Sequence, residues 1–123
     1  RDFTYIDDIV DGIVRVLDSP AKPNLEWSGS KPGPGTSLAP WRVYNIGNES
    51  PVALLDYISA IEDALNVKAI KDLLPMQPGD VPDTYADISD LVSDLNYKPS
   101  VDVKDGVRYF VDWYLEFYKS KKC

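Results

Sequence analysis

Two polar clusters in this 123-residue sequence combine side chains that could bind a phosphate or a sugar. Arg1-Asp2 stands directly before an apolar run, where a guanidinium could grip a phosphate through two parallel hydrogen bonds. Gln77-Pro78-Gly79-Asp80 presents an amide and a carboxylate on a rigid turn, and these groups suit sugar or ribose hydroxyls. Each cluster also has a structural interpretation, which is a surface salt bridge at Arg1 and a plain Pro-Gly turn with Asp80 bonding its own backbone.

The composition excludes several other kinds of chemistry. Thirteen Lys and Arg against twenty Asp and Glu give a net charge of −7, and the sequence has no histidine. Histidine triads and histidine metal sites are therefore excluded, and a nucleic-acid or anionic-membrane partner is not expected. The single cysteine, Cys123, cannot pair within the chain, which fits a reducing, cytoplasmic compartment. No apolar run is long enough to span a bilayer.

Signatures of nucleotide and nucleophile chemistry are also missing. The sequence has no Gly-x-Gly-x-x-Gly run, no Walker loop and no nucleophile elbow. The acidic pairs Asp7-Asp8 and Glu62-Asp63 are most simply a helix start and a solvated helix face. Nothing in their spacing favours a carboxylate-based hydrolase.

The elements expected to position the polar clusters form an α/β pattern of short strands alternating with helices. β-Branched and aromatic runs predict strands over 3–6, 42–46 and 67–74. Apolar spacing predicts helices over 8–17, 51–65 and 88–95, and a longer one from 103 toward the C-terminus. The expected N-caps are Asp7, Ser50, and Asp87 or Ser89, while Asn66 is expected to end the second helix in a left-handed turn.

One face of each long helix is expected to be buried. Gly12, in the first helix, predicts close packing against another element. The late lysines of the last helix, Lys119, Lys121 and Lys122, complement its dipole. The expected core positions are Ile9, Val10, Ile13, Val14, Leu17, Leu54, Leu55, Ile58, Ile61, Leu65, Val103, Val107, Phe110, Val111, Tyr114, Phe117 and Tyr118.

A Pro- and Gly-rich loop over 19–41 interrupts this pattern. It holds five of the ten prolines, and loops of this length are either functional or flexible. Trp27 and Trp41 could anchor it. Two interpretations are open, namely a cover for a ligand or partner and a mobile surface loop.

Three runs resemble, in this order, the C-terminal part of extended short-chain dehydrogenase/reductase enzymes that act on nucleotide sugars. They are Arg1–Ile9, Tyr44–Asn48 and Leu74–Val81, and the likeness covers nearly the whole chain. The first two runs are typical of the superfamily. The third, together with the Pro-rich loop, most closely resembles the UDP-glucuronate 4-epimerase branch.

The resemblance implies that residues 1–123 are the substrate-binding part of a Rossmann-type enzyme. The family's NAD-binding part, with its glycine-rich loop and catalytic tyrosine–lysine pair, lies N-terminal to it. Because the chain begins with Arg1 and its only methionine is Met76, we expect a piece of a longer protein. The resemblance implies that this piece holds no catalytic residue and is inactive alone, since the family's catalytic pair lies in the N-terminal half. By resemblance, Arg1 contacts the UDP diphosphate and Asp80 the uridine ribose. Gln77 falls where galactose-type epimerases often carry a second phosphate-binding arginine.

The reaction implied is reversible inversion at C4 of UDP-glucuronate, giving UDP-galacturonate through a transient 4-keto intermediate that depends on bound NAD. The family is commonly homodimeric. Two alternatives stay open: a UDP-glucuronate decarboxylase or nucleotide-sugar dehydratase of the same superfamily, and a non-catalytic interaction module if the chain is complete.

Overall fold

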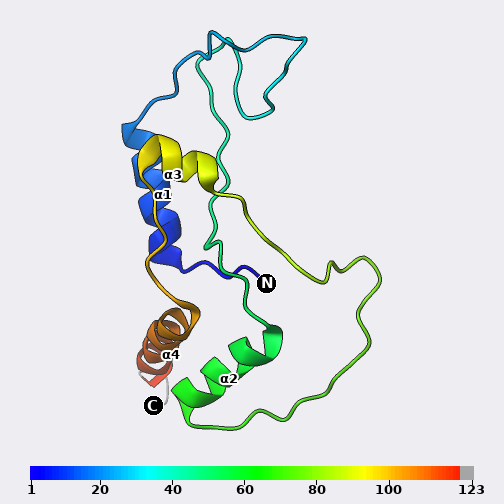
Figure 1. Cartoon of the computed structure of the whole chain (residues 1–123). Helices are drawn as coiled ribbons and strands as arrows, with labels where there is room; N and C mark the ends of the chain where they lie inside the picture. The colour runs from blue at the N-terminus through cyan, green and yellow to red at the C-terminus, as the bar shows by residue number, and fades with distance from the viewer. Residues whose placement is uncertain (120–123) are drawn as a thin grey trace.

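The computed structural model describes residues 1–119 as four helices joined by long extended segments (Figure 1). The predictions on Lys121, Lys122 and Cys123 lie outside these residues. In the middle of the molecule, below the loop that follows α1 in Figure 1, α1 (Ile6–Asp18) lies beside α3 (Ser89–Leu95). At one end of the molecule α2 (Leu54–Leu65) packs along α4 (Val103–Lys119).

The predicted strands are wrong for this chain. Within residues 1–119 the only β pairing consists of two isolated bridges, Ser28 with Lys31 and Thr36 with Arg42. Segments 3–5, 42–46 and 67–74 are outside regular structure. The physical reason is that a strand needs a neighbour to accept and donate its backbone hydrogen bonds, and these segments have no continuous partner among the described residues.

The four predicted helices are confirmed, but two of the predicted starts are wrong. Helix α1 begins at Ile6, so Asp7 lies inside its first turn rather than capping it. Helix α2 begins at Leu54 after Ala53, which leaves Ser50 and Pro51 outside it. Asn66 ends α2 with φ 53°, as predicted.

The other two helix starts follow the sequence closely. The Asp87 carboxylate accepts the Ser89 N–H at 3.0 Å, so it satisfies a free donor at the start of α3. The Asp102 carboxylate accepts the Asp105 N–H at 2.9 Å at the start of α4. Each carboxylate also places negative charge at the positive end of a helix dipole.

The first of two small cores joins α1 to α3. Its centre is fully buried and consists of Ile88, Leu91 and Tyr97. The predicted close packing at Gly12 is confirmed, because a Cβ there would lie 3.3 Å from both Ile46 and the Tyr97 ring. The partly buried residues around this core are Val16, Tyr44, Ile46, Ala86 and Leu95.

A second core joins α2 to α4 through Ala60, Val107 and Val111. The prediction that the α4 aromatic residues are buried is wrong for all four of them, since Phe110 is 56% exposed and Tyr114, Phe117 and Tyr118 are 44–45% exposed. Their rings contact one another along the helix surface instead, with the Phe110 and Tyr114 centroids 6.2 Å apart.

The apolar stripe of α1 is also exposed, contrary to prediction. The side chains at Val10, Ile13 and Val14 are 47–49% exposed, and Leu17 is 72% exposed. On α2, Leu54 and Leu55 are exposed in the same way. Helical periodicity identifies the apolar faces correctly, but the described chain covers only part of each: α4 packs on Ala60 and Ile61 of α2, whereas Val10, Ile13, Val14 and Leu17 of α1 stay largely uncovered.

The Pro-rich loop is organised by its own hydrogen bonds. The Asn24 N–H donates to the Ser37 carbonyl at 2.9 Å, and the Trp27 indole donates to the Gly33 carbonyl at 3.3 Å. Trp27 therefore anchors the loop as predicted, whereas Trp41 is 41% exposed. Across residues 1–119 none of the helices combines the length and apolar character needed to cross a membrane.

Candidate functional site

Two of the predicted site residues line one cavity. A hollow of about 560 Å³ lies between the chain start, the residues before α2 and the segment that follows α2. Arg1 contributes the single basic side chain of its wall, and Asp80 contributes a carboxylate from the opposite segment. The remaining wall is formed by Pro51, Val52, Ala53, Leu54, Leu74, Met76, Val81, Pro82 and Asp83.

Arg1 is held at this wall by its backbone. Its nitrogen donates to the Val52 carbonyl at 2.8 Å, and its carbonyl accepts the Val52 N–H at 2.9 Å. Among residues 1–119 no carboxylate forms a salt bridge with the Arg1 guanidinium, so the salt-bridge interpretation is wrong for the described chain. The guanidinium is thus available to an anion entering the cavity.

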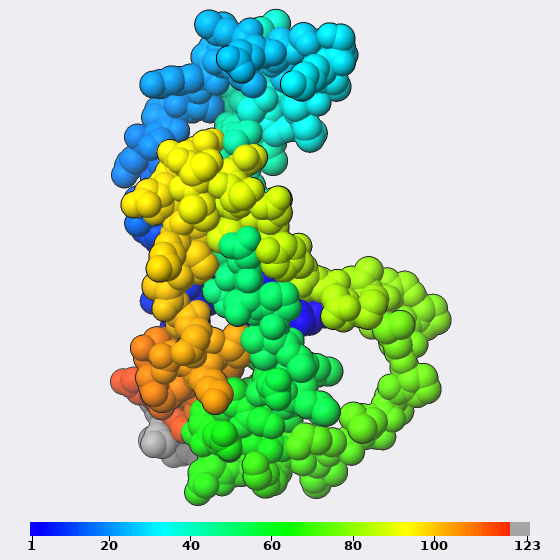
Figure 2. Space-filling model, viewed as in Figure 1, coloured from blue at the N-terminus to red at the C-terminus, as the bar shows by residue number. Residues whose placement is uncertain are grey.

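Asp80 lies on the arch, which we define as residues 67–86. Figure 2 shows the arch in green and yellow-green, curving away from the rest of the molecule around an opening. Every residue from 67 to 83 is exposed. Arg1 and Asp80, a cation and a carboxylate from segments far apart in the sequence, thus line the same cavity.

The predicted Pro-Gly turn is confirmed in the backbone. The Asp80 N–H donates to the Gln77 carbonyl at 3.1 Å, and Gly79 has a φ of 92°. Only glycine adopts that φ without strain, which explains the residue type. The Asp80 carboxylate accepts no hydrogen bond within the described chain, and Gln77 is not among the residues that line the cavity.

A buried carboxylate, Glu62 on α2, anchors the outgoing end of the arch. Its side chain is only 4% exposed and accepts Lys68 Nζ at 2.9 Å, the Ala69 N–H at 3.0 Å and Lys71 Nζ. The hydrogen bond from Lys71, followed by those from Lys68 and Ala69, lowers the pKa of Glu62 to about 2. The prediction that Glu62 belongs to a solvated helix face is therefore wrong.

Asp2 anchors the returning end of the arch. Its N–H donates to Thr84 Oγ1 at 3.1 Å, and its carboxylate accepts the Ala86 N–H at 3.4 Å. The same carboxylate accepts the N–H groups of Glu49 and Ser50, each at 3.3 Å. Asp2 therefore joins three chain segments next to the cavity.

A second buried carboxylate, Asp8, joins α1 to the segment before α4. It accepts the N–H and hydroxyl of Ser100, both at 3.0 Å, and the Val101 N–H at 3.1 Å. With all its partners supplied by the chain, Asp8 is a structural residue.

Glu62 and Asp2 are anchors that were not predicted, although the sequence carries a signal for Glu62. It lies four residues after Ile58 and three before Leu65, so it shares the apolar face of α2. Asp2 carries no comparable signal, because its partners are backbone groups brought together only by the fold.

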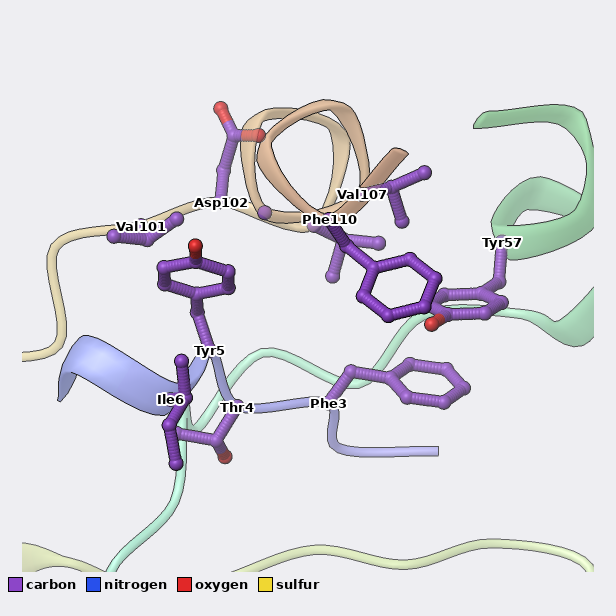
Figure 3. A pocket seen from close by; sticks show the side chains of 11 residues that line it. Phe3, Thr4, Tyr5, Ile6, Tyr57, Val101, Asp102, Val107 and Phe110 are labelled. Atoms are coloured by element: carbon purple, nitrogen blue, oxygen red, sulfur yellow. The ribbon is translucent and has the colours of Figure 1, made fainter. Parts of the chain in front are cut away.

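A second cavity, about 260 Å³, is apolar (Figure 3). Phe3 stacks on Tyr57 with ring centroids 4.1 Å apart, and Tyr5 and Phe110 border the same space. Its only ionisable acid, Asp102, already caps α4. No lysine or arginine of residues 1–119 lines this cavity, so it offers no cation to a phosphate.

A separate polar cluster at Arg42 is saturated by its own partners. The guanidinium lies 3.0 Å from Asp90 and 3.1 Å from Asp94. Burial, followed by the hydrogen bond to Asp94, raises the pKa of the Tyr44 hydroxyl. Within the described residues, no group of three acidic or cysteine side chains is arranged to hold a metal ion.

Comparison with known proteins agrees with the predicted resemblance. Protein CapI of Staphylococcus aureus is 56% identical over 119 residues, which cover 97% of this chain and 36% of that protein. UDP-glucuronate 4-epimerase 4 of Arabidopsis thaliana is 46% identical over 123 residues, which cover 99% of this chain and 27% of that protein. No protein-family model matches the chain.

Solved structures show the same likeness. The crystal structure of UDP-glucuronic acid 4-epimerase from Bacillus cereus in complex with UDP-glucuronic acid and NAD superposes with a TM-score of 0.71 and 34% identity. The match covers 96% of this chain and 32% of that one. The resemblance to NAD-dependent nucleotide-sugar epimerases is confirmed, and this chain spans about a third or a quarter of the length of the relatives it matches.

Proposed function

We propose that this chain is the C-terminal, substrate-binding part of an NAD-dependent UDP-glucuronate 4-epimerase. The parent enzyme inverts C4 of UDP-glucuronate to give UDP-galacturonate through a 4-keto intermediate. Similarity over nearly the whole chain to epimerases of this kind supports the proposal. These 123 residues, taken alone, are expected to be inactive and to bind UDP weakly.

The observation that carries the proposal is the shared cavity of Arg1 and Asp80. A guanidinium free of carboxylate partners can pair with diphosphate oxygens, and charge-assisted hydrogen bonds of this kind are about twice as strong as those between neutral groups. A carboxylate without an internal partner can accept hydrogen bonds from the two ribose hydroxyls. We therefore assign Arg1 to the diphosphate and Asp80 to the ribose of a UDP-sugar.

Gln77 is proposed as a minor contact. Its amide sits on the turn that carries Asp80 but outside the cavity wall. A neutral amide in place of a second cation leaves Arg1 as the main source of positive charge at this cavity.

The residues of this chain do not form a dinucleotide site. The sequence has no glycine-rich loop of the Gly-x-Gly-x-x-Gly kind, which lets backbone N–H groups approach a pyrophosphate. We propose that NAD, the hydride acceptor and donor of the reaction, is bound by the part of the parent enzyme that precedes this chain. What this chain supplies is binding and orientation of the nucleotide.

The test is the reaction of the full-length protein with UDP-glucuronate. Formation of UDP-galacturonate, separated by chromatography, supports the epimerase. Formation of UDP-xylose with release of carbon dioxide contradicts it and assigns the decarboxylase instead. A cytoplasmic location and a homodimeric parent enzyme are further parts of the proposal, and the dimer is checked by sedimentation velocity.

A further inference from the structure

We propose that Asp2 is a positioning residue for the Arg1–Asp80 cavity, which it shapes without touching the ligand. This inference rests on the proposed function, because it concerns the same nucleotide site. Asp2 is singled out by its place in the chain. It directly follows Arg1, and its partner Thr84 directly follows residues 80–83, which line the cavity on the other side.

The hydrogen bonds of Asp2 join the two walls of the cavity. Through its N–H and its carboxylate, Asp2 holds Thr84 at 3.1 Å and Ala86 at 3.4 Å, at the returning end of the arch. Through Glu49 and Ser50 it also holds the segment that precedes Val52, the backbone partner of Arg1. A displacement of Asp2 would therefore move both ligand-binding side chains relative to each other.

Both oxygens of the Asp2 carboxylate accept hydrogen bonds from the protein. They accept three backbone N–H groups, and Asp2 is not among the residues that line the cavity. Three donors also offset its negative charge, which would otherwise oppose a diphosphate bound at the neighbouring Arg1. These contacts favour positioning over direct binding.

Gly47 provides independent support for this arrangement. A Cβ at position 47 would collide with the Cβ of Ala86 and would lie 2.9 Å from Asp2 Oδ2. The φ of Gly47 is not in the left-handed region, so the requirement for glycine comes from this close approach alone. The returning end of the arch can reach Asp2 because position 47 has no side chain.

A second contact at the returning end of the arch also supports this arrangement. The Tyr85 hydroxyl donates to the Glu49 carboxylate at 2.9 Å, so residues 84–86 and 49–50 are joined by side chains as well as through Asp2. The middle of the arch has no comparable contact with the rest of the described chain. The returning end is therefore where the position of Asp80 is set.

The test is Asp2→Asn in the full-length enzyme, with Asp7→Asn as the matched control. Asparagine keeps the shape of the Asp2 side chain but replaces one acceptor oxygen by an NH2 donor, which faces the backbone N–H donors. Asp7 is a suitable control because it is exposed and makes no side-chain hydrogen bond in the described chain. We expect Asp2→Asn to raise the KM for UDP-glucuronate by about tenfold, with kcat within about twofold, because displaced binding groups lose affinity. Amide hydrogen exchange at Ser50 and Ala86 is expected to become faster, and Asp7→Asn is expected to change neither quantity.

If Asp2→Asn fails to fold, Thr84→Val removes one of the same bonds and is expected to raise the KM by about threefold. Faster exchange with an unchanged KM would overturn the proposal, as it would show Asp2 to be structural only. A drop in kcat at unchanged KM would overturn it too. Titration with UDP, followed by calorimetry, distinguishes a failure of this proposal from a failure of the proposed function. Wild-type protein that binds UDP without converting UDP-glucuronate refutes the epimerase. Weaker UDP binding by Asp2→Asn than by the wild type still supports the positioning role in that case.

Discussion

The two parts of the connection between α2 and α3 are stabilised in opposite ways. Residues 67–83 bury no side chain, and contacts at the ends of the arch, made by Glu62 and Asp2, hold this segment to the rest of the molecule. Residues 84–88 lead into a core in which Ile88 is 2% exposed, and the following helix α3 adds the fully buried Leu91. Asp80 and Gln77, two of the three residues assigned to ligand binding, lie in the first part, so their placement depends on a few polar contacts rather than on packing.

The largest effect expected from this contrast is on stability. Leu91→Ala should lower the free energy of unfolding by about 2–5 kcal/mol, because it removes a buried side chain and leaves a cavity. Leu73→Ala, at a side chain that is 80% exposed on the arch, should change it by less than about 0.5 kcal/mol. Urea denaturation of both variants measures the difference, and equal losses would break the comparison.

The next effect concerns the charge at the cavity wall. Arg1→Ala in the full-length enzyme should weaken transition-state and ground-state binding alike by about 1.5–3 kcal/mol, seen as a higher KM for UDP-glucuronate. Arg108→Ala is the control, since Arg108 lies on the surface of α4 and pairs with Asp105 at 2.8 Å. An unchanged KM for Arg1→Ala would remove Arg1 from the site.

A smaller effect distinguishes the two polar residues of the turn. Asp80→Ala should raise the KM by about two- to tenfold, the loss expected for one or two hydrogen bonds to hydroxyls. Gln77→Ala should raise it less, because Gln77 lies outside the cavity wall. Steady-state kinetics on both variants would sharpen the assignment, and a larger effect at Gln77 would reverse it.

The last effect is local and depends on pH. Hydrogen bonds from Lys71, Lys68 and Ala69 lower the pKa of Glu62 to about 2. The stabilisation that the ionised carboxylate gives the arch is therefore complete above pH 4.5 and is lost as the pH falls through about 2. The Glu62 carboxyl carbon, followed by NMR, should titrate near pH 2 in the wild type. In Lys71→Met the midpoint should rise, and a wild-type midpoint at 4.5 would show that the anchor does not form.

Helix periodicity proved a sound guide to which segments fold, but not to which faces are covered. All four helices were predictable because apolar residues recur at helical spacing, and Asn66 ended α2 as expected. The exposure of Val10 and Phe110 could not be predicted, because it depends on which elements pack against them. The missing strands have the same cause, since pairing requires partners.

The residues of the site also divide into those that the sequence predicts and those that depend on the fold. Residue chemistry and family resemblance pointed to Arg1 and Asp80, and the fold brings both to one cavity. The anchors were not predictable in the same way. The partners of Asp2 are backbone N–H groups from distant segments, and backbone donors are identical in every residue except proline.

The most direct test of the account is a crystal structure of the full-length protein with UDP-glucuronate bound. We expect the diphosphate within hydrogen-bonding distance of the Arg1 guanidinium and a ribose hydroxyl within hydrogen-bonding distance of the Asp80 carboxylate. A nucleotide bound away from the cavity between Arg1 and the arch would contradict the central claim.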